Sequence, residues 1–430
     1  MPNDKLFQRA AEIGIEDYQT EANPVFFWDL AGEQGHPLRT TVSEMGPTLL
    51  GRILELNDTP SGILDIVFQL ADDQGLLLLD LDDLRAMLNL VADERKEISA
   101  KYGLISAQSL AAIQRAVLGL ERDGGKDFFG EPALQLEDLM RTNLQGRGII
   151  NLLAANKLIL TPRLYSSFLL WLLSELFENL PEVGDLDKPK LIFFIDEAHL
   201  LFEGYPPSLL KRVEQIMRLI RSKGVGVYFC SQFPDDVPNE ILGQLGNRIQ
   251  HALRAYTPRD QKAVNTAAET FVPNPKLVVT DVISQLAVGE ALVSMLADKG
   301  VPSMVERALI APPRCRMGPA LIDELQQVRA QGPIGGKYDH LINRESAYEL
   351  LHNRRSNSEP EPSTSSENAA QAGPKTEEQG WFSELIFGNK RRQGLAETLS
   401  KQAARTVGNQ LGKQILRGLL GGILGKSTRR

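Results

Sequence analysis

The chain has 430 residues, of which 42% are hydrophobic and 24% charged, and its formal net charge is −8. This size and composition allow a sizeable hydrophobic core and exclude a disordered or fibrous protein. Two cysteines, Cys230 and Cys315, are too few for a disulfide framework or a zinc site. The N-terminus has no apolar signal core and no apolar run approaches the length of a membrane span, so we expect a cytoplasmic protein.

The charge is unevenly distributed along the chain. From Lys390 onward there are ten basic residues and one acid, Glu397, which gives this tail +9 and leaves −17 in residues 1–389. A polyanionic partner would therefore meet the tail or a local patch before it met the acidic body.

The first half of the chain combines two predicted strands with a long helical stretch. Pro24–Trp28 and Gly148–Ala155 are apolar runs typical of buried strands. The segment His36–Val42 is polar and turn-rich. Between Met45 and Leu144 the apolar residues recur at three- and four-residue spacing, which predicts helices. Thr161 and Pro162 then begin a long apolar helix that extends to Leu180.

One acidic cluster lies inside the helical stretch. Leu76–Leu79 is followed by Asp80, Asp82 and Asp83, which raises the question of a metal site. The cluster lacks the glycine turn and distal glutamate of a calcium loop. We therefore expect these acids to lie in the first turn of a helix, where carboxylates are favoured.

The second half alternates strands with helices. Strands are predicted at Lys190–Ile195, at Gly224–Ser231, which places Cys230 in the core, and at Arg248–Arg254. Leu286–Met295 and Val301–Ala311 form a β pair, and helices are expected over about 207–223, 236–246 and 257–271. Strands that alternate with helices imply parallel βαβ units, so the predicted fold is α/β with a doubly wound, mostly parallel sheet.

Two carboxylates follow the most apolar of these strands. Leu191–Ile195 has no polar break and ends on Asp196 and Glu197, and the carboxyl end of such a strand is where open α/β sheets bind ligands. In a P-loop nucleoside triphosphatase this is the Walker B strand, whose first acid holds Mg²⁺ and whose second polarises the attacking water. The alternative is that the two acids cap the following helix.

Three further polar residues follow neighbouring strands. Gln232 comes directly after the Gly224–Ser231 strand and would lie beside Asp196 and Glu197, as a sensor of a γ-phosphate. Arg248 and Arg254 are six residues apart, so on one strand they would share a face and reach a nucleotide in their own or a neighbouring subunit. A surface ion pair is the alternative for either arginine.

Three segments together carry a family resemblance: DLDKPKLIFFIDEAHLLF (Asp185–Phe202), Arg218–Val264 and VGEALVSML (Val288–Leu296). They resemble the HerA/FtsK-type ATPases, and within them the bacterial YjgR-like branch. The resemblance covers most of residues 1–355. It implies a RecA-like core with a helical insertion at about 46–145, hexameric rings, and ATP hydrolysis with Mg²⁺ coupled to action on DNA. It assigns Asp196 and Glu197 to the Walker B pair, Gln232 to the sensor, and Arg248 or Arg254 to the subunit interface.

The phosphate-binding loop of this superfamily has no match in the sequence. GxxxxGK[ST] cradles phosphates with backbone N–H groups and a lysine, and the nearest approach, Gly421–Ser427, has Leu420 where the first glycine should stand. The sequence therefore predicts an ATPase that lacks its first segment. The alternative is an inactive remnant or accessory subunit that assembles through its core and its C-terminal helix.

The C-terminal part separates into a linker and a tail. Residues 356–380 are rich in Ser, Glu and Pro, which predicts a disordered linker. In the tail, residues 381–430, apolar residues recur every four positions on one helical stripe: Leu395, Leu399, Ala403, Val407, Leu411, Ile415 and Leu419. Such a basic amphipathic helix fits packing on a partner helix, an anionic membrane surface, or nucleic-acid phosphates.

Overall fold

The computed structural model describes residues 4–184, 186–202 and 207–358. These residues belong to one compact unit, Met1–Ser358. The predicted tail, and the predicted linker beyond residue 358, lie outside the described residues.

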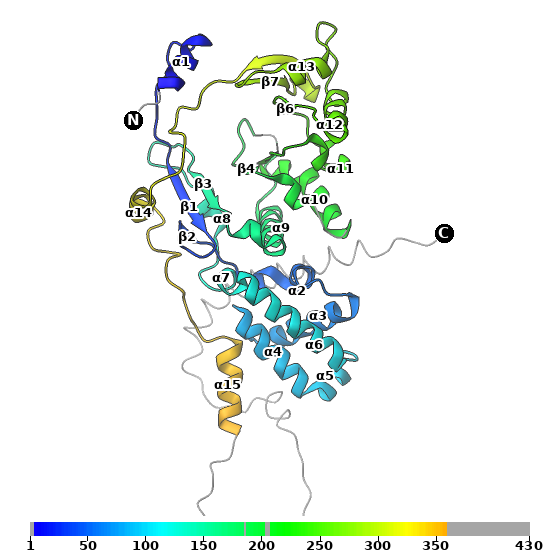
Figure 1. Cartoon of the computed structure of the whole chain (residues 1–430). Helices are drawn as coiled ribbons and strands as arrows, with labels where there is room; N and C mark the ends of the chain where they lie inside the picture. Colours follow the sequence, from blue (N-terminus) through cyan, green and yellow to red (C-terminus); the bar gives the residue numbers. More distant parts are fainter. Residues whose placement is uncertain (1–3, 185, 203–206, 359–430) are drawn as a thin grey trace, which may run out of the picture. The chain divides into compact units, whose positions relative to one another are not determined.

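The first sheet is parallel and brings distant segments together. Strand β1 (Val25–Asp29) lies between β2 (His36–Pro37) and β3 (Ile150–Ala154), which places Phe27 opposite Leu152 (Figure 1). Helix α1 (Asp4–Glu12) precedes it. The two strands predicted for this half of the chain are confirmed, whereas β2 was not predicted.

The segment around β2 is buried, although its composition is polar and turn-rich. His36 Nδ1 lies 2.8 Å from Asp339 Oδ1, and Arg39 Nη1 donates to the carbonyl of Tyr338 at 3.0 Å. Burial lowers the pKa of Arg39 despite the nearby carboxylates. The partners come from a C-terminal segment that includes α14 (Ile322–Gln331) and α15 (Ala347–Ser358). Because these polar groups find hydrogen-bond partners, the segment can enter the core.

The predicted helical stretch is confirmed and forms a packed helical region (Figure 1). The apolar sides of its helices supply a large part of the hydrophobic core, and α15 packs against α4. Its helices are α2 (Val42–Ile53), α3 (Asp58–Asp73), α4 (Leu81–Asp93), α5 (Arg95–Tyr102), α6 (Ala107–Leu120), the π-helix η1 (Glu121–Gly125), α7 (Lys126–Phe128) and α8 (Leu136–Leu139).

The second sheet carries the predicted site. Strands β4 (Leu191–Ile195) and β5 (Val225–Phe229) are parallel, with Ile195 opposite Phe229. Their inward residues join the core, and α9 and α10 contact each other nearby. The surrounding helices are η2 (Leu158–Leu160), α9 (Pro162–Asn179), η3 (Ala198–Leu201), α10 (Pro207–Leu219) and η4 (Ile220–Lys223).

The other face of this sheet is open. We call Ile192, Phe194, Gly226 and Tyr228 the outer face, because they alternate with the inward residues and stand opposite one another in the register. Ile192, Phe194 and Tyr228 are exposed. The rings of Phe194 and Tyr228 stack with their centroids 4.5 Å apart.

The third sheet is antiparallel and lies further along the chain. Its order is β6 (Arg248–Gln250), β7 (Glu290–Ser294) and β8 (Glu306–Leu309). The predicted β pair is thus confirmed, but the strand at Arg248 ends at Gln250 and does not reach Arg254. Helices η5 (Pro234–Asp236), α11 (Asn239–Leu242), α12 (Pro258–Glu269), α13 (Val279–Gln285) and η6 (Asp298–Gly300) complete the described residues.

The α/β fold class with parallel strands is confirmed. In the described residues the parallel strands fall into two separate sheets, and the strand at Arg248 joins an antiparallel one. No single helix among these residues is long and apolar enough to cross a membrane. One pair of helical segments, Arg95–Tyr102 and Ala107–Phe128, is long and apolar enough when the two are taken together, but the pair is bent by 102°. Its residues Ile98, Ile113 and Val117 are buried in the core.

Candidate active site at the end of strands β4 and β5

Strand β4 ends in a sharp turn at Glu197. This residue has φ 48° and ψ 51°, which lies in the left-handed region that side chains with a Cβ rarely adopt. Such a conformation costs about 1 to 3 kcal/mol and concentrates at functional sites. Glu197 occupies the N-cap position of η3, yet its side chain makes no capping hydrogen bond. The alternative that this glutamate serves as a helix cap therefore does not hold in the structure.

The Glu197 carboxylate faces the next strand. Gln232 Nε2 lies 3.2 Å from Glu197 Oε1 and 3.3 Å from Oε2, so the amide donates to the carboxylate. This pairing follows from the parallel register, because β4 and β5 end side by side. The structure thus brings together the two residues that were expected to meet at this edge.

Asp196 lies at the same edge and is exposed. Its Oδ1 accepts the backbone N–H of Glu197 at 3.0 Å, which leaves Oδ2 available to a ligand. Cys230, which follows β5, is exposed, whereas its sequence context predicted a core residue. It sits on the site edge: its N–H donates to the Ile195 carbonyl, and its carbonyl accepts from Ala198. Partial burial, and then the Asp196 charge, raise the pKa of the Cys230 thiol.

His199 is a neighbour that the sequence interpretation did not single out. Its Nδ1 lies 3.3 Å from Glu197 Oε2. The only signal available in the sequence was its position two residues after the glutamate. The glutamate therefore has a second nitrogen close by, in addition to the Gln232 amide.

The two predicted arginines lie in the third-sheet region. Arg248 Nη1 donates to the Thr270 carbonyl at 2.7 Å, and burial lowers the pKa of Arg248. Arg254 lies beyond β6, and its Nη2 donates to the Leu286 carbonyl at 2.9 Å. The prediction that Arg248 and Arg254 share one strand face is therefore wrong. Arg248 and Gln232 both line a cavity of about 260 Å³. In this structure, then, both arginines are bound to backbone carbonyls.

A family model described as "Helicase HerA-like C-terminal" matches residues 1–429. The chain belongs to the HerA-like helicase family. This HerA-like chain is similar to several solved structures. They include two structures of the plasmid coupling protein TrwB and one of VirB4 of Thermoanaerobacter pseudethanolicus. No curated protein matches the chain.

The likeness to these structures is distant. TrwB with the non-hydrolysable GTP analogue GDPNP is 12% identical, with 72% of this chain and 81% of that chain covered and a TM-score of 0.44. TrwB with ADP and Mg²⁺ is 13% identical, with 71% of this chain and 76% of that chain covered and a TM-score of 0.42. VirB4 is 15% identical, with 74% of this chain and 80% of that chain covered and a TM-score of 0.42.

The donor set of the HerA-like site suits a magnesium nucleotide better than a metal held by protein alone. Among the described residues, no group of three or more His, Cys, Asp or Glu side chains is arranged to hold a metal ion. Mg²⁺ is usually bound by one or two carboxylates, with water and substrate phosphates completing its coordination. Asp196, with one carboxylate oxygen unused by the turn, fits this requirement.

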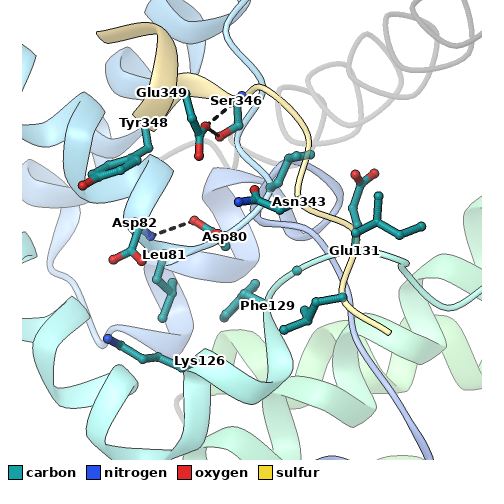
Figure 2. Close-up of a pocket in the computed structure, with 14 residues that line it drawn as sticks. Asp80, Leu81, Asp82, Lys126, Phe129, Glu131, Asn343, Ser346, Tyr348 and Glu349 are labelled. Carbon is teal, nitrogen blue, oxygen red and sulfur yellow. Dashed lines mark hydrogen bonds between the residues drawn. The ribbon is translucent and has the colours of Figure 1, made fainter. Parts of the chain in front are cut away.

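The acidic cluster at the start of α4 has a structural role, as expected. Asp80 is the N-cap of α4 and accepts from the N–H groups of Asp82 and Asp83 at 2.9 and 3.0 Å. Figure 2 shows this cap at the wall of a cavity of about 410 Å³, with Ser346 and Glu349 on another side. Glu131 in the same wall is held by Arg344 at 2.6 and 2.7 Å. These acids are thus largely occupied by bonds within the protein.

Proposed function

We propose that this HerA-like chain supplies the metal-binding and water-activating part of an ATPase site that acts on DNA in the cytoplasm. Asp196 would hold Mg²⁺ on the β- and γ-phosphates, and Glu197 would accept the proton of the attacking water. Family membership supports the class of activity. DNA as the partner rests on the family alone.

The observation that carries the proposal is the Gln232–Glu197 contact at the carboxyl edge of a parallel sheet. A glutamate used only for helix capping would have its oxygens on the amides of η3. Here the carboxylate faces the neighbouring strand, within 3.3 Å of a side-chain amide. Gln232 would hold the base in position and, once a nucleotide arrives, would turn its amide to the γ-phosphate or the water.

The arginines belong to the assembled form of this proposal. Arg248 and Arg254 would contribute positive charge to a nucleotide at a subunit interface of a ring, with the hexamer of the resembled family as its expected size. Each must first exchange its bond to the Thr270 or Leu286 carbonyl. On assembly, each arginine would therefore exchange its bond to a backbone carbonyl for a contact with the nucleotide.

The phosphate cradle must come from outside these 430 residues, because GxxxxGK[ST] is absent from them. ATP binding by this chain is conditional on that cradle. The amphipathic tail predicted from the sequence would serve assembly, by docking on a partner helix or on an anionic membrane surface.

A second candidate is an accessory subunit without turnover. The absent cradle and the open outer face of β4 and β5 favour it, since both leave the chain dependent on other residues. In this alternative the chain keeps the fold and the interface, while Asp196 and Glu197 have no catalytic role.

The decisive test is ATP turnover by the full chain, tagged and isolated from its native cells together with the polypeptides that accompany it. Glu197→Gln should reduce turnover about 100-fold or more while nucleotide stays bound, because only the base is removed. Glu240→Gln, an exposed glutamate in α11, is the matched control and should retain full turnover. Equal turnover in Glu197→Gln would remove the catalytic role, and absence of both binding and turnover would favour the accessory subunit.

A further inference from the structure

The side chain of Gln232 has free space beside it. It is exposed and lines the cavity of about 260 Å³ at the end of β5. Its amide nitrogen nevertheless lies 3.2 and 3.3 Å from the two oxygens of the Glu197 carboxylate. Fixing a glutamine side chain costs rotamer entropy, and the cavity offers this one other positions. The contact with Glu197 therefore depends on how firmly the backbone around Gln232 is held.

One carboxylate oxygen holds the residues on both sides of Gln232. The Ser231 hydroxyl donates to Asp236 Oδ2, and the Phe233 N–H donates to the same oxygen at 3.1 Å. The Asp236 side chain is 11% exposed, and the next residue, Val237, is buried in the core. Hydrogen bonds to an ionised acceptor are stronger than those between neutral groups. The backbone at Gln232 is thus tied on both sides to a residue beside the core.

The alternative role for Asp236 is that of a helix cap. Asp236 lies in the three-residue helix η5, and the bond that it accepts from the Phe233 N–H is that of a capping box. A cap does not explain the bond from Ser231, because this hydroxyl belongs to the segment before the helix. The two bonds together enclose Gln232, which a cap for η5 does not require.

A further contact connects this carboxylate with α12. The Arg259 guanidinium lies over the Phe233 ring, 5.1 Å from its centroid, and Arg259 Nη2 is 4.0 Å from Asp236 Oδ1. The Arg259 side chain is 69% exposed, so water screens its interaction with the carboxylate. We therefore expect Arg259 to contribute less than Asp236 to holding this segment.

We infer that Asp236 is a positioning residue for Gln232 and keeps its amide beside the Glu197 carboxylate. The inference rests on the proposed function and adds to it the residue that fixes the sensor. Asp236 acts on the site through Gln232, because its side-chain hydrogen bonds go to the two neighbours of that residue. Without these bonds the Gln232 side chain would move into the adjoining cavity.

The side-chain amide resonance of Gln232 reports the contact without any turnover. The full chain is labelled with glutamine that carries ¹⁵N in its side-chain amide, and the Gln232 resonance is identified by its absence in Gln232→Ala. Glu197→Ala defines the resonance position without the contact. Asp236→Ala should move the resonance to that position, because the amide is no longer held beside the carboxylate. Asp235→Ala, at the adjacent exposed position, is the matched control and should leave it unchanged.

Gln114 supplies an internal standard for folding. Its amide donates to Asn89 at 3.0 Å in the helical region, so its resonance should be the same in every variant that folds. Asp236→Asn keeps an oxygen that can accept both bonds and should retain most of the contact. Ser231→Ala removes one of the two bonds and should move the Gln232 resonance in the same direction by a smaller amount. If Asp236→Ala displaces the Gln114 resonance, Ser231→Ala and Asp236→Asn decide the proposal.

The kinetic constants separate positioning from nucleotide binding. Asp236→Ala should lower kcat for ATP about 10-fold and change KM by less than about two-fold, because a misplaced amide affects the reacting groups more than the bound nucleotide. In a Gln232→Ala background the same substitution should cause no further loss, since Asp236 acts through Gln232. A purely structural role for Asp236 would lower kcat in both backgrounds.

Three results would overturn the proposal. They are an unchanged Gln232 resonance in a folded Asp236→Ala chain, a kcat equal to that of the wild type, and a loss of kcat that is as large without Gln232 as with it. A displaced resonance in a chain whose wild type shows no turnover would keep the role of Asp236 and reject the proposed function. Wild-type turnover with an unchanged resonance would keep the proposed function and reject the role of Asp236.

Discussion

Two regions of this molecule start from the same local pattern and end differently. In the helical region, Leu76–Leu79 leads into Asp80, Asp82 and Asp83, and in the β4 region Leu191–Ile195 leads into Asp196 and Glu197. Both are apolar runs that deliver acids to the start of a helix. At α4 the acids bond to backbone amides, whereas at η3 the glutamate faces a neighbouring strand.

The difference shows what decides the role of an acid in such a pattern. Asp83 accepts from the N–H groups of Leu79 and Asp80 at 2.8 and 3.2 Å and from that of Tyr348 at 2.8 Å. Glu197 has no such amides, because its left-handed backbone turns it away from η3. Acids that saturate their bonding capacity locally are structural, and acids held at a strand end with capacity left over remain available for chemistry.

The largest expected effect that sharpens this contrast is on stability at Asp83. Asp83→Ala should lower the free energy of unfolding by about 3 to 4 kcal/mol, because it leaves several buried donors without an acceptor. Asp196→Ala is the matched control and should change it by no more than about 0.5 kcal/mol. Urea unfolding followed by circular dichroism measures both, and equal losses would break the comparison.

A second prediction concerns the pH dependence of stability at Asp138, a buried residue of α8. Burial alone would raise the pKa of Asp138, but hydrogen bonds from Lys337, Tyr338 and Arg141 outweigh it and hold the pKa below its usual value. Asp138→Asn should therefore cost about 2 to 3 kcal/mol at neutral pH, through the loss of a charged acceptor.

The sign of the pH dependence follows from the direction of that shift. A lowered pKa gives stability that is present above the unfolded value of about 3.9 and is lost as the pH falls through the folded pKa. The gap between the wild type and Asp138→Asn should thus be constant above about pH 5 and narrow below about pH 4. Unfolding midpoints from pH 3 to 7 check this, with Asp235→Asn, an exposed position, as the control. A gap that widened in acid would contradict the prediction.

The smallest expected effect is at Glu197 and has the opposite sign. Glu197→Gly should stabilise the fold by about 0.5 to 1 kcal/mol, since the relief of left-handed strain exceeds the entropy that glycine loses on folding. Glu197→Ala keeps the Cβ and hence the strain, so it should show no such gain. Thermal unfolding compares the two, and a loss of stability in Glu197→Gly would mean that the turn is not strained.

Local signals in the sequence were enough for much of the fold. Thr161 and Pro162 do begin α9, and Thr257 begins α12 through a capping box with Asp260. Each of these features depends on residues within four positions of one another. The Asp196, Glu197 and Gln232 cluster was also predictable, because strand ends meet wherever parallel strands pair.

The remaining features depend on partners far away in the sequence. His36 and Arg39 look exposed until Tyr338 and Asp339 are brought beside them. The strand at Arg248 pairs with a hairpin that begins at Glu290, and no local pattern in the sequence reveals this pairing. The left-handed turn at Glu197 is likewise a property of how β4 enters η3 and has no residue signature, since glycine would be the expected choice there.

The hydrogen bond between His36 and Asp339 spans 303 positions in the sequence. Arg329 provides a second long-range connection, because it donates to Asp339 and to the Gly32 carbonyl. The first sheet therefore lacks its closing contacts until synthesis has passed residue 339. During that interval the nascent chain keeps the polar groups around β2 without their final partners, and closure of so large a loop is slow. Growth of this chain on the ribosome thus creates a long period in which chaperones have access to its first strands.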